Sequence, residues 1–320
     1  MIGDHHTQTV DLTTCGIAAW ASVTADRREI AALRKNPGEF QGGRSPALAV
    51  KLADDQAVLA LVAVLRAIQS AGWTEPSFRD WGVIAGPRYL ARVSTANTLE
   101  RFQRMGPRGV SPLAIPQTML SAISGTMSVA LGAQGLNCGV GGAPGQLSDA
   151  LLVGLTLLDT QVLAGLWVVL TEWSTEPVPD GAGDTQTESM CRALALACTP
   201  GSSGGSQLVL TRDLNTGIPD ADGADSDTSL VRLLDFWNNK QTVPTVRLVP
   251  WRRIYTSPVG RCTWEGQCEW RFVAKWQPWP TRRWTKRGLW RGWQCRKYNG
   301  ALPSCWKEIR SSCVIRIQFG

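Results

Sequence analysis

LERFQRMGPRGVSPLAIPQTMLSAISGTMSVALGAQGLNCGVGGAPGQLSDALLVG, residues 99–154, carries the strongest fold signal in this chain. It predicts an apolar helix of small residues over 116–131, then a short extended piece over 137–142 that enters a Gly/Pro turn. Pro144 fits the first position of the following helix, where its missing N–H costs nothing. We expect that helix to end near Leu158. A strand, a glycine turn and a helix in this order are typical of layered α/β structure.

A second helical pattern precedes this stretch. Val58, Leu61, Val62, Leu65 and Ile68 follow the i, i+3, i+4, i+7 spacing of a helix with one buried face. Two aspartates before the pattern and a glycine just after it suit the two ends of a helix. The sequence therefore predicts a buried helix over 54–71.

The remaining elements are predicted from shorter apolar runs. We expect strands over 9–22, 81–86, 162–170 and 207–212, helices over 26–36, 94–104 and 229–237, and either a helix or a strand over 191–198. Strands and helices that alternate in this way predict an α/β domain whose sheet is covered by helices on both faces.

One apolar stretch has the length of a membrane span. Residues 151–170 contain a single charged residue, Asp159. The Asp-Thr-Gln sequence at 159–161 favours a turn, so we interpret the stretch as the end of a buried helix followed by a buried strand. The amino terminus carries no basic, apolar signal sequence, which favours a cytoplasmic protein.

Charge divides the chain near Pro244. Residues 1–244 hold 17 Lys/Arg and 23 Asp/Glu, whereas residues 245–320 hold 16 and 3, together with nine of the 15 Trp and five of the nine Cys. A sign reversal of this size marks a compositional boundary. We therefore expect a folded domain over 1–244 and an irregular basic tail over 245–320, either disordered or translated out of frame.

The body of the chain resembles the β-ketoacyl-acyl-carrier-protein synthases of the thiolase fold. The resemblance rests on Ser111-Pro112, on the small-residue helix 121–131, on the turn Gly135-Leu136-Asn137, and on a strand over 161–172 that ends in an acidic residue. It extends over about 9–235. It implies the amino-terminal half of that fold, with a mixed sheet of about five strands and helices on both faces.

The sequence departs from this family at the catalytic position. The family places a cysteine at the strand-to-helix turn, where the helix dipole and turn amides favour a thiolate. Alignment by resemblance gives Gly142, Ala143, Pro144 and Gly145 at this turn, with Pro144 in the nucleophile's place. Cys138 lies six residues earlier, as a core thiol in the predicted strand. The catalytic histidines of the family's second half have no counterpart, because the chain's two histidines are adjacent, at positions 5 and 6.

The resemblance therefore implies a non-catalytic, ketosynthase-like protein of fatty acid, polyketide or aryl-polyene biosynthesis. Its expected partner is an active ketosynthase-like subunit or an acyl carrier protein, in a homodimer or a heterodimer. No cofactor is implied. Gly142, Ala143 and Gly145 remain candidates for contact with an anion or an acyl thioester at the helix start. A residual enzyme that transfers acyl groups through another residue is a further alternative.

The tail supports a different class of function. Residues 276–293, WQPWPTRRWTKRGLWRGW, interleave tryptophan with arginine and lysine. Stacking aromatics among basic residues are typical of proteins that bind single-stranded nucleic acid, and an anionic membrane surface is a second partner of this chemistry. The principal alternative function is thus nucleic-acid binding through the tail.

Other motifs are weak. Residues 139–145, GVGGAPG, would match a dinucleotide-binding loop only with glycine in place of Pro144. The tail cysteines form no C-x-x-C pair, and His5-His6 have no partners at metal-ligand spacing. We therefore expect no metal site and no nucleotide site.

Overall fold

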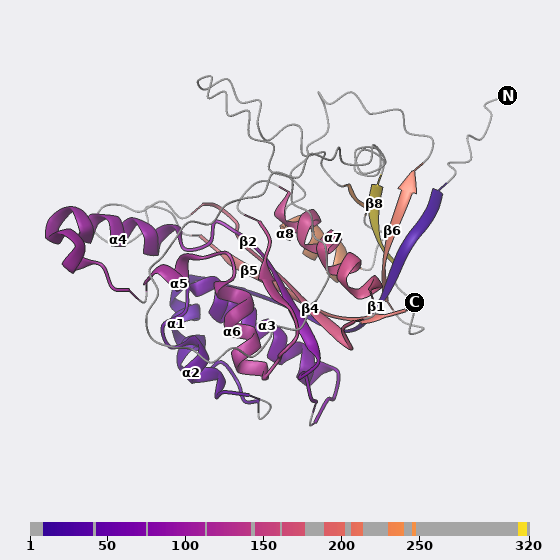
Figure 1. Cartoon of the computed structure of the whole chain (residues 1–320), viewed down its shortest axis with the longest axis horizontal. Helices are drawn as coiled ribbons and strands as arrows, with labels where there is room; N and C mark the ends of the chain where they lie inside the picture. The colour runs from indigo at the N-terminus through magenta and orange to yellow at the C-terminus, as the bar shows by residue number, and fades with distance from the viewer. Residues whose placement is uncertain are drawn as a thin grey trace, which may run out of the picture.

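The structure is a computed structural model of the whole chain (Figure 1). It describes residues 9–40, 43–74, 76–112, 114–141, 145–160, 162–176, 189–201, 206–213, 230–239, 245–247 and 313–318.

One sheet organises the described residues. Its strands are β1 (Thr9–Ala25), β2 (Trp81–Arg88), β3 (Asn137–Gly139), β4 (Gly165–Trp173), β5 (Cys191–Pro200), β6 (Gln207–Asp213), β7 (Thr245–Arg247) and β8 (Cys313–Gln318). Their spatial order is β3-β2-β4-β5-β1-β6-β8-β7. β2 pairs in parallel with β3 and β4, and the other pairs are antiparallel. The sheet is therefore mixed, as predicted, and residues 1–244 contribute six strands where about five were expected.

The helix predicted over 54–71 is the most buried of the described helices. It is α3 (Asp55–Ser70), whose start is capped by the Asp54 side chain, which accepts a hydrogen bond from the Gln56 N–H at 2.9 Å. Twelve of its 16 residues are buried. It packs on one face of the sheet beside α1 (Arg27–Lys35), α2 (Pro46–Val50) and α6 (Ala122–Leu131), as Figure 1 shows. Burial of this apolar surface is the main stabilising contribution on this side of the sheet.

The opposite face of the sheet is covered by α7 (Gln146–Asp159) and α8 (Leu230–Asn239). Leu151 and Leu155 of α7 are buried against the sheet, and Leu152 is partly buried. A Cβ at Gly86 of β2 would lie 2.8 Å from the Ala150 Cβ, so glycine there allows α7 to approach the strand. Helices on both faces confirm the predicted α/β class.

The apolar stretch 151–170 divides as predicted. α7 ends at Asp159 and β4 begins at Gly165. Within the described residues, no helix has the length and hydropathy needed to cross a membrane.

Several predicted elements differ in extent. The helix expected over 116–131 is split into α5 (Ala114–Thr118) and α6, and β1 is 17 residues long, extending to Ala25. α2 was not predicted from the sequence, and Pro46 stands in its first turn. Residues 191–198, left open between helix and strand, are part of β5.

The predicted tail enters the sheet at both of its ends. β8 pairs with β6 from Gln207↔Gln318 to Arg212↔Cys313, and β7 pairs with β8. The irregular tail predicted over 245–320 is therefore not irregular throughout, because six of its last residues extend the sheet. Residues 248–312, including the Trp-rich stretch, lie outside the described residues.

Candidate functional site

The turn before α7 is where the sequence resemblance predicts the position of a nucleophile. β3 ends at Gly139, and α7 begins at Gln146 with Gly145 as its N-cap. Gly145 has φ 97°, and no side chain caps the helix, although the Asp149 N–H donates to the Gly145 carbonyl at 3.0 Å. Of the four predicted site residues only Gly145 is described, and it stands at the helix start. Gly142, Ala143 and Pro144 lie outside the described residues.

Two details of this turn differ from the sequence prediction. The helix begins two residues after Pro144 rather than at it. β3 is the end strand in the order of the described sheet, whereas the family resemblance predicts that the helix after this turn follows a central strand. Gly141, with φ 147°, holds the chain against the end of β2: a Cβ there would lie 3.0 Å from the Pro87 carbonyl oxygen. The turn therefore lies beside the carboxyl end of β2.

The described thiols are not activated. Cys15, Cys138, Cys191 and Cys198 are all free, and Cys15, Cys191 and Cys198 are buried. Burial raises the pKa of the Cys138 and Cys191 thiols, which keeps both protonated at neutral pH. Cys138 lies within β3, opposite Ile84. Among the described residues, no cysteine stands at the start of α7.

A buried polar network lies at the carboxyl ends of β2 and β4. Gln56 of α3 donates from Nε2 to the Arg88 carbonyl at 2.8 Å, and its Oε1 accepts from the Thr171 hydroxyl at 2.6 Å. The Arg88 guanidinium pairs with Glu172 Oε1 at 3.0 Å, and Glu172 Oε2 accepts from the Leu230 N–H at 2.6 Å. The network connects α3, both strands and the start of α8.

Glu172 has a structural part in this network. Both of its carboxylate oxygens are engaged, and its side chain is 4% exposed, so it is placed to orient Arg88 and α8 rather than to exchange protons with a substrate. The sequence indicated an acidic residue at the end of this strand. It gave no signal for Gln56, because a polar residue in the first turn of a helix is ordinarily exposed.

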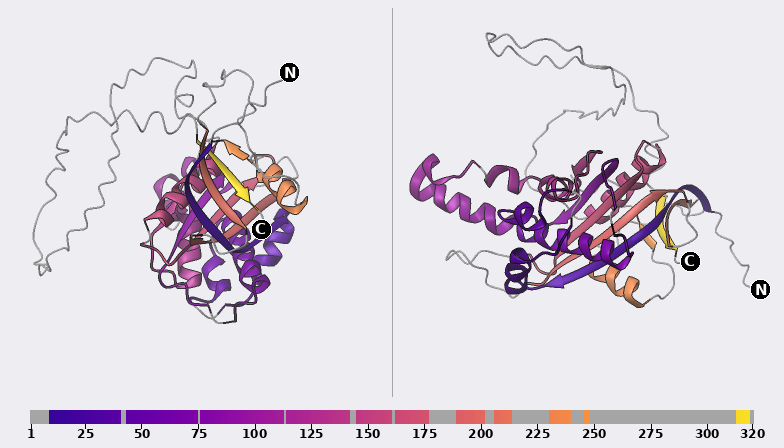
Figure 2. Two further views of the ribbon diagram at one scale, coloured as in Figure 1. Left: turned by 90° about the vertical axis from the view of Figure 1, so that its right-hand side faces the viewer. Right: turned by 90° about the horizontal axis from the view of Figure 1, so that it is seen from below.

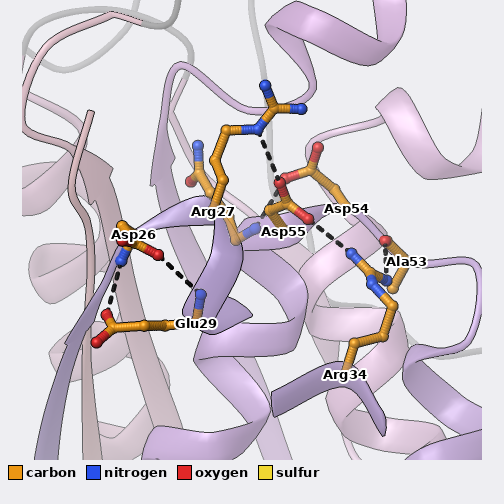
Figure 3. A network of polar contacts seen from close by, with 8 residues as sticks. Asp26, Arg27, Glu29, Arg34, Ala53, Asp54 and Asp55 are labelled. Atoms are coloured by element: carbon orange, nitrogen blue, oxygen red, sulfur yellow. Dashed lines mark hydrogen bonds and ion pairs between the residues drawn. The ribbon is translucent and has the colours of Figure 1, made fainter. Parts of the chain in front are cut away.

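A second polar cluster surrounds the start of α3 (Figure 3). Arg34 of α1 donates to Asp55 Oδ1 at 2.7 Å and to the carbonyls of Val50 and Ala53 at 2.7 and 2.6 Å. Arg27 Nε lies 3.9 Å from Asp55 Oδ2. Burial raises the pKa of Asp54 from its ordinary 3.8 to about 6. The sequence predicted this aspartate as part of an acidic first turn that complements the helix dipole, but it did not predict the side-chain cap or the altered ionisation.

The described residues contain no cluster of three or more His, Cys, Asp or Glu side chains placed to hold a metal ion. Both histidines precede residue 9 and lie outside those ranges.

Residues 30–144 match the family model of the β-ketoacyl synthase N-terminal domain. This part of the chain is β-ketoacyl synthase-like. The match ends at Pro144. It confirms the resemblance drawn from the sequence and agrees with a sheet flanked on both faces by helices. No curated protein sequence matches the chain.

Solved structures similar to this ketosynthase-like chain include three ketosynthase complexes. The first is the ketosynthase ApeO with its chain length factor ApeC from Xenorhabdus doucetiae, at 15% identity and a TM-score of 0.47, covering 73% of this chain and 95% of that chain. The second is AntDE:AntF, a type II polyketide acyl-carrier protein with its ketosynthase, at 13% identity and a TM-score of 0.43, covering 59% of this chain and 63% of that chain. The third is the ishigamide ketosynthase/chain length factor, at 18% identity and a TM-score of 0.41, covering 58% of this chain and 62% of that chain. The ketosynthase-like chain thus spans less than two thirds of the second and third of these structures.

Proposed function

We propose that this chain is a non-catalytic ketosynthase-like subunit of acyl-carrier-protein-dependent fatty acid, polyketide or aryl-polyene biosynthesis, paired with an active ketosynthase. The observation that carries the proposal is the sequence of this turn, which has no nucleophilic side chain where the resemblance places the family's cysteine. Proline stands in the sequence where the family has cysteine, and the nearest described thiol, Cys138, is held protonated in β3.

A partner-binding role is supported by the exposed helix α4 (Arg92–Met105). None of its residues is buried, and it projects from the body of the molecule (Figure 1; Figure 2, right). Leu99, Phe102 and Met105 are 58%, 49% and 64% exposed. A helix of this length gains most of its stability from packing of an apolar face, so a partner that covers these side chains would stabilise it.

The surface continues from α4 towards the end of the sheet. η1 (Gly106–Gly109) and α5 follow α4, and Ile115 and Met119 are 62% and 54% exposed. A Cβ at Gly139 would lie 1.9 Å from the Leu120 carbonyl oxygen, so this segment crosses directly over β3. Because β3 ends the described strand order, the apolar surface adjoins a strand edge that another chain can pair with.

The non-catalytic part of the proposal is tested by the acylation of the purified full chain. Incubation with acyl thioesters, followed by intact-mass analysis, is expected to show no covalent adduct. Pro144→Cys should not restore condensation of malonyl groups, because the family's histidines are also missing. A stoichiometric acyl adduct mapped to a residue of the unaltered chain would show that it is an enzyme.

The pairing is tested by coexpression of this chain with an active ketosynthase and an acyl carrier protein. A complex of defined stoichiometry supports the proposal. The competing function, nucleic-acid binding through the Trp-rich tail, predicts instead a salt-sensitive affinity for single-stranded DNA that is lost when residues 248–312 are removed.

A further inference from the structure

A small cavity near the start of α3 has no part in the proposed pairing. Its volume is about 190 Å³, and it lies between α1, the first turn of α3 and the first turn of α4, with Trp173 of β4 in its wall. The charged and polar side chains that line it are Arg27, Arg34, Asp54, Asp55, Arg92, Ser94 and Asn97. Three guanidinium groups from two helices therefore meet at one opening.

Two of these arginines form ion pairs that are exposed or long. Arg92 Nε pairs with Glu176 at 2.9 Å, but the two side chains are 55% and 42% exposed, and Arg27 lies 3.9 Å from Asp55. Ion pairs this exposed contribute little to stability, so a bound anion can compete with the carboxylates. Arg34 is held more firmly, by Asp55 and two carbonyls, and it neutralises the Asp55 carboxylate.

The first turn of α4 adds donors to the same wall. No side chain caps this helix, and its first backbone bond runs from the Thr95 N–H to the Ala91 carbonyl at 2.8 Å. The amides of the first turn lack intrahelical acceptors. Ala91, Arg92, Val93 and Ser94 all line the cavity, so this helix end opens into it beside the arginines.

Asp54 is the group that opposes an anion here. It faces Arg27 and Arg34 of α1, Asp55 of its own helix, Arg92 across the cavity, and the Cys191 thiol of β5. Its pKa of about 6 means that it takes up a proton in mildly acidic solution. The protonated carboxyl no longer repels an anion and can donate a hydrogen bond to it.

We propose that this cavity binds a small tetrahedral oxyanion of the sulfate or phosphate class, held by Arg27, Arg92 and the first turn of α4. Binding is coupled to uptake of a proton by Asp54. The anion should therefore bind more tightly as the pH falls.

Sulfate is the first probe, because its charge is constant between pH 5 and 8. Its dissociation constant for the full chain is measured by calorimetry at pH 5.5 and 7.5, with sodium chloride at equal ionic strength as the reference. If the anion raises the pKa of Asp54 by about one further unit, the affinity falls roughly sixfold between these two pH values. A response to sulfate no larger than the response to chloride at either pH overturns the proposal.

Variants separate the site from general charge effects. Arg92→Gln should weaken sulfate binding by about tenfold or more, because a charge-assisted contact is lost. Arg101→Gln, an exposed position on the same helix, should leave it unchanged. Asp54→Asn should abolish the pH dependence. Asn97→Leu gives a second test within the cavity if the Arg92 variant does not fold, and unchanged sulfate affinity in the folded cavity variants overturns the proposal.

A comparison of inorganic phosphate with glycerol 3-phosphate at pH 7.5 identifies the source of the anion. Tighter binding of the ester indicates the phosphate end of a larger molecule, and equal or tighter binding of inorganic phosphate indicates a free anion.

Discussion

At the scale of single residues, the described side chains that bear chemistry are engaged in structure. Both oxygens of Glu172 are bonded, the three cysteines of the interior are buried, and Cys138 is kept protonated. Asp54 is different, because its carboxyl ionises near neutral pH. An ionisable group whose pKa differs between the folded and the unfolded chain makes the free energy of unfolding depend on pH.

Asp54→Asn should increase the stability of the chain at neutral pH. The folded-state pKa, about 6, exceeds the ordinary 3.8, so the folded chain binds this proton more tightly than the unfolded chain. Wild-type stability therefore falls as the pH rises from about 4 to 6, by at most about 3 kcal/mol. Asparagine retains the capping oxygen and carries no charge. Urea unfolding between pH 4 and 8 checks this.

Asp55→Asn is the matched control for this prediction. It removes the partner of Arg34 at 2.7 Å, so it should lower stability at neutral pH. A neutral-pH loss of stability in Asp54→Asn as large as that in Asp55→Asn would contradict the altered ionisation of Asp54.

Glu172→Gln should destabilise the fold by about 3 kcal/mol, because it leaves the largely buried Arg88 guanidinium without its carboxylate. Urea unfolding of the full chain measures the loss. Glu176→Gln, in the exposed pair with Arg92, should cost less than about 1 kcal/mol. Equal costs in the two variants would mean that the network at the ends of β2 and β4 does not hold the fold together.

At the scale of elements, the main contrast is between α3 and α4. α3 buries most of its residues, whereas no residue of α4 is buried. The sequence predicts both as helices, but the large apolar side chains of α4, Leu99, Phe102 and Met105, are not covered by any other described part of the chain. An element of this kind is suited to contact with another chain.

Phe102→Glu should weaken association with the proposed ketosynthase partner by at least about tenfold and leave the free energy of unfolding within about 0.5 kcal/mol of wild type, because the ring is 49% exposed. Analytical ultracentrifugation of the mixed subunits measures the association. Gln103→Glu, exposed on the same helix, adds the same charge and should have little effect. Loss of pairing in both variants would indicate a charge effect instead of an apolar contact.

At the scale of the whole molecule, the basic carboxy-terminal part of the sequence is joined to the sheet. β8 forms a six-residue ladder with β6, and Figure 2 shows β8 beside the strands of the body. A strand at this place covers an edge that would otherwise be open to other chains.

Removal of residues 245–320 should leave a cooperatively folded body, because the two apolar clusters on either face of the sheet lie within residues 15–234. The exposed edge of β6 should increase self-association, measured by light scattering at increasing concentration. Unchanged association would mean that β8 does not protect this edge.

Resequencing the gene over the codons for 240–255 tests whether the basic segment is in frame.

The sequence by itself determined the fold class and most of the order of the elements before residue 244. Helix α3 was predictable because its apolar residues repeat at helical spacing between an acidic start and Gly72, and the 151–170 stretch was divisible because Asp159 interrupts it. The family resemblance was also readable from local sequence, whereas the alignment of Pro144 with the family's cysteine stays a prediction. These features depend on residues that lie close together along the chain, so they can be recognised from the sequence alone.

Only the tertiary structure decided which residues meet across the sheet. Gln56, Arg88 and Glu172 come from three distant segments, and their contacts depend on strand order and register. The pKa of Asp54 follows from burial by elements far along the chain, and β8 finds β6 across about a hundred residues. The arginine-lined cavity has the same origin, since the starts of α1, α3 and α4, which are remote in sequence, meet there beside Trp173 of β4.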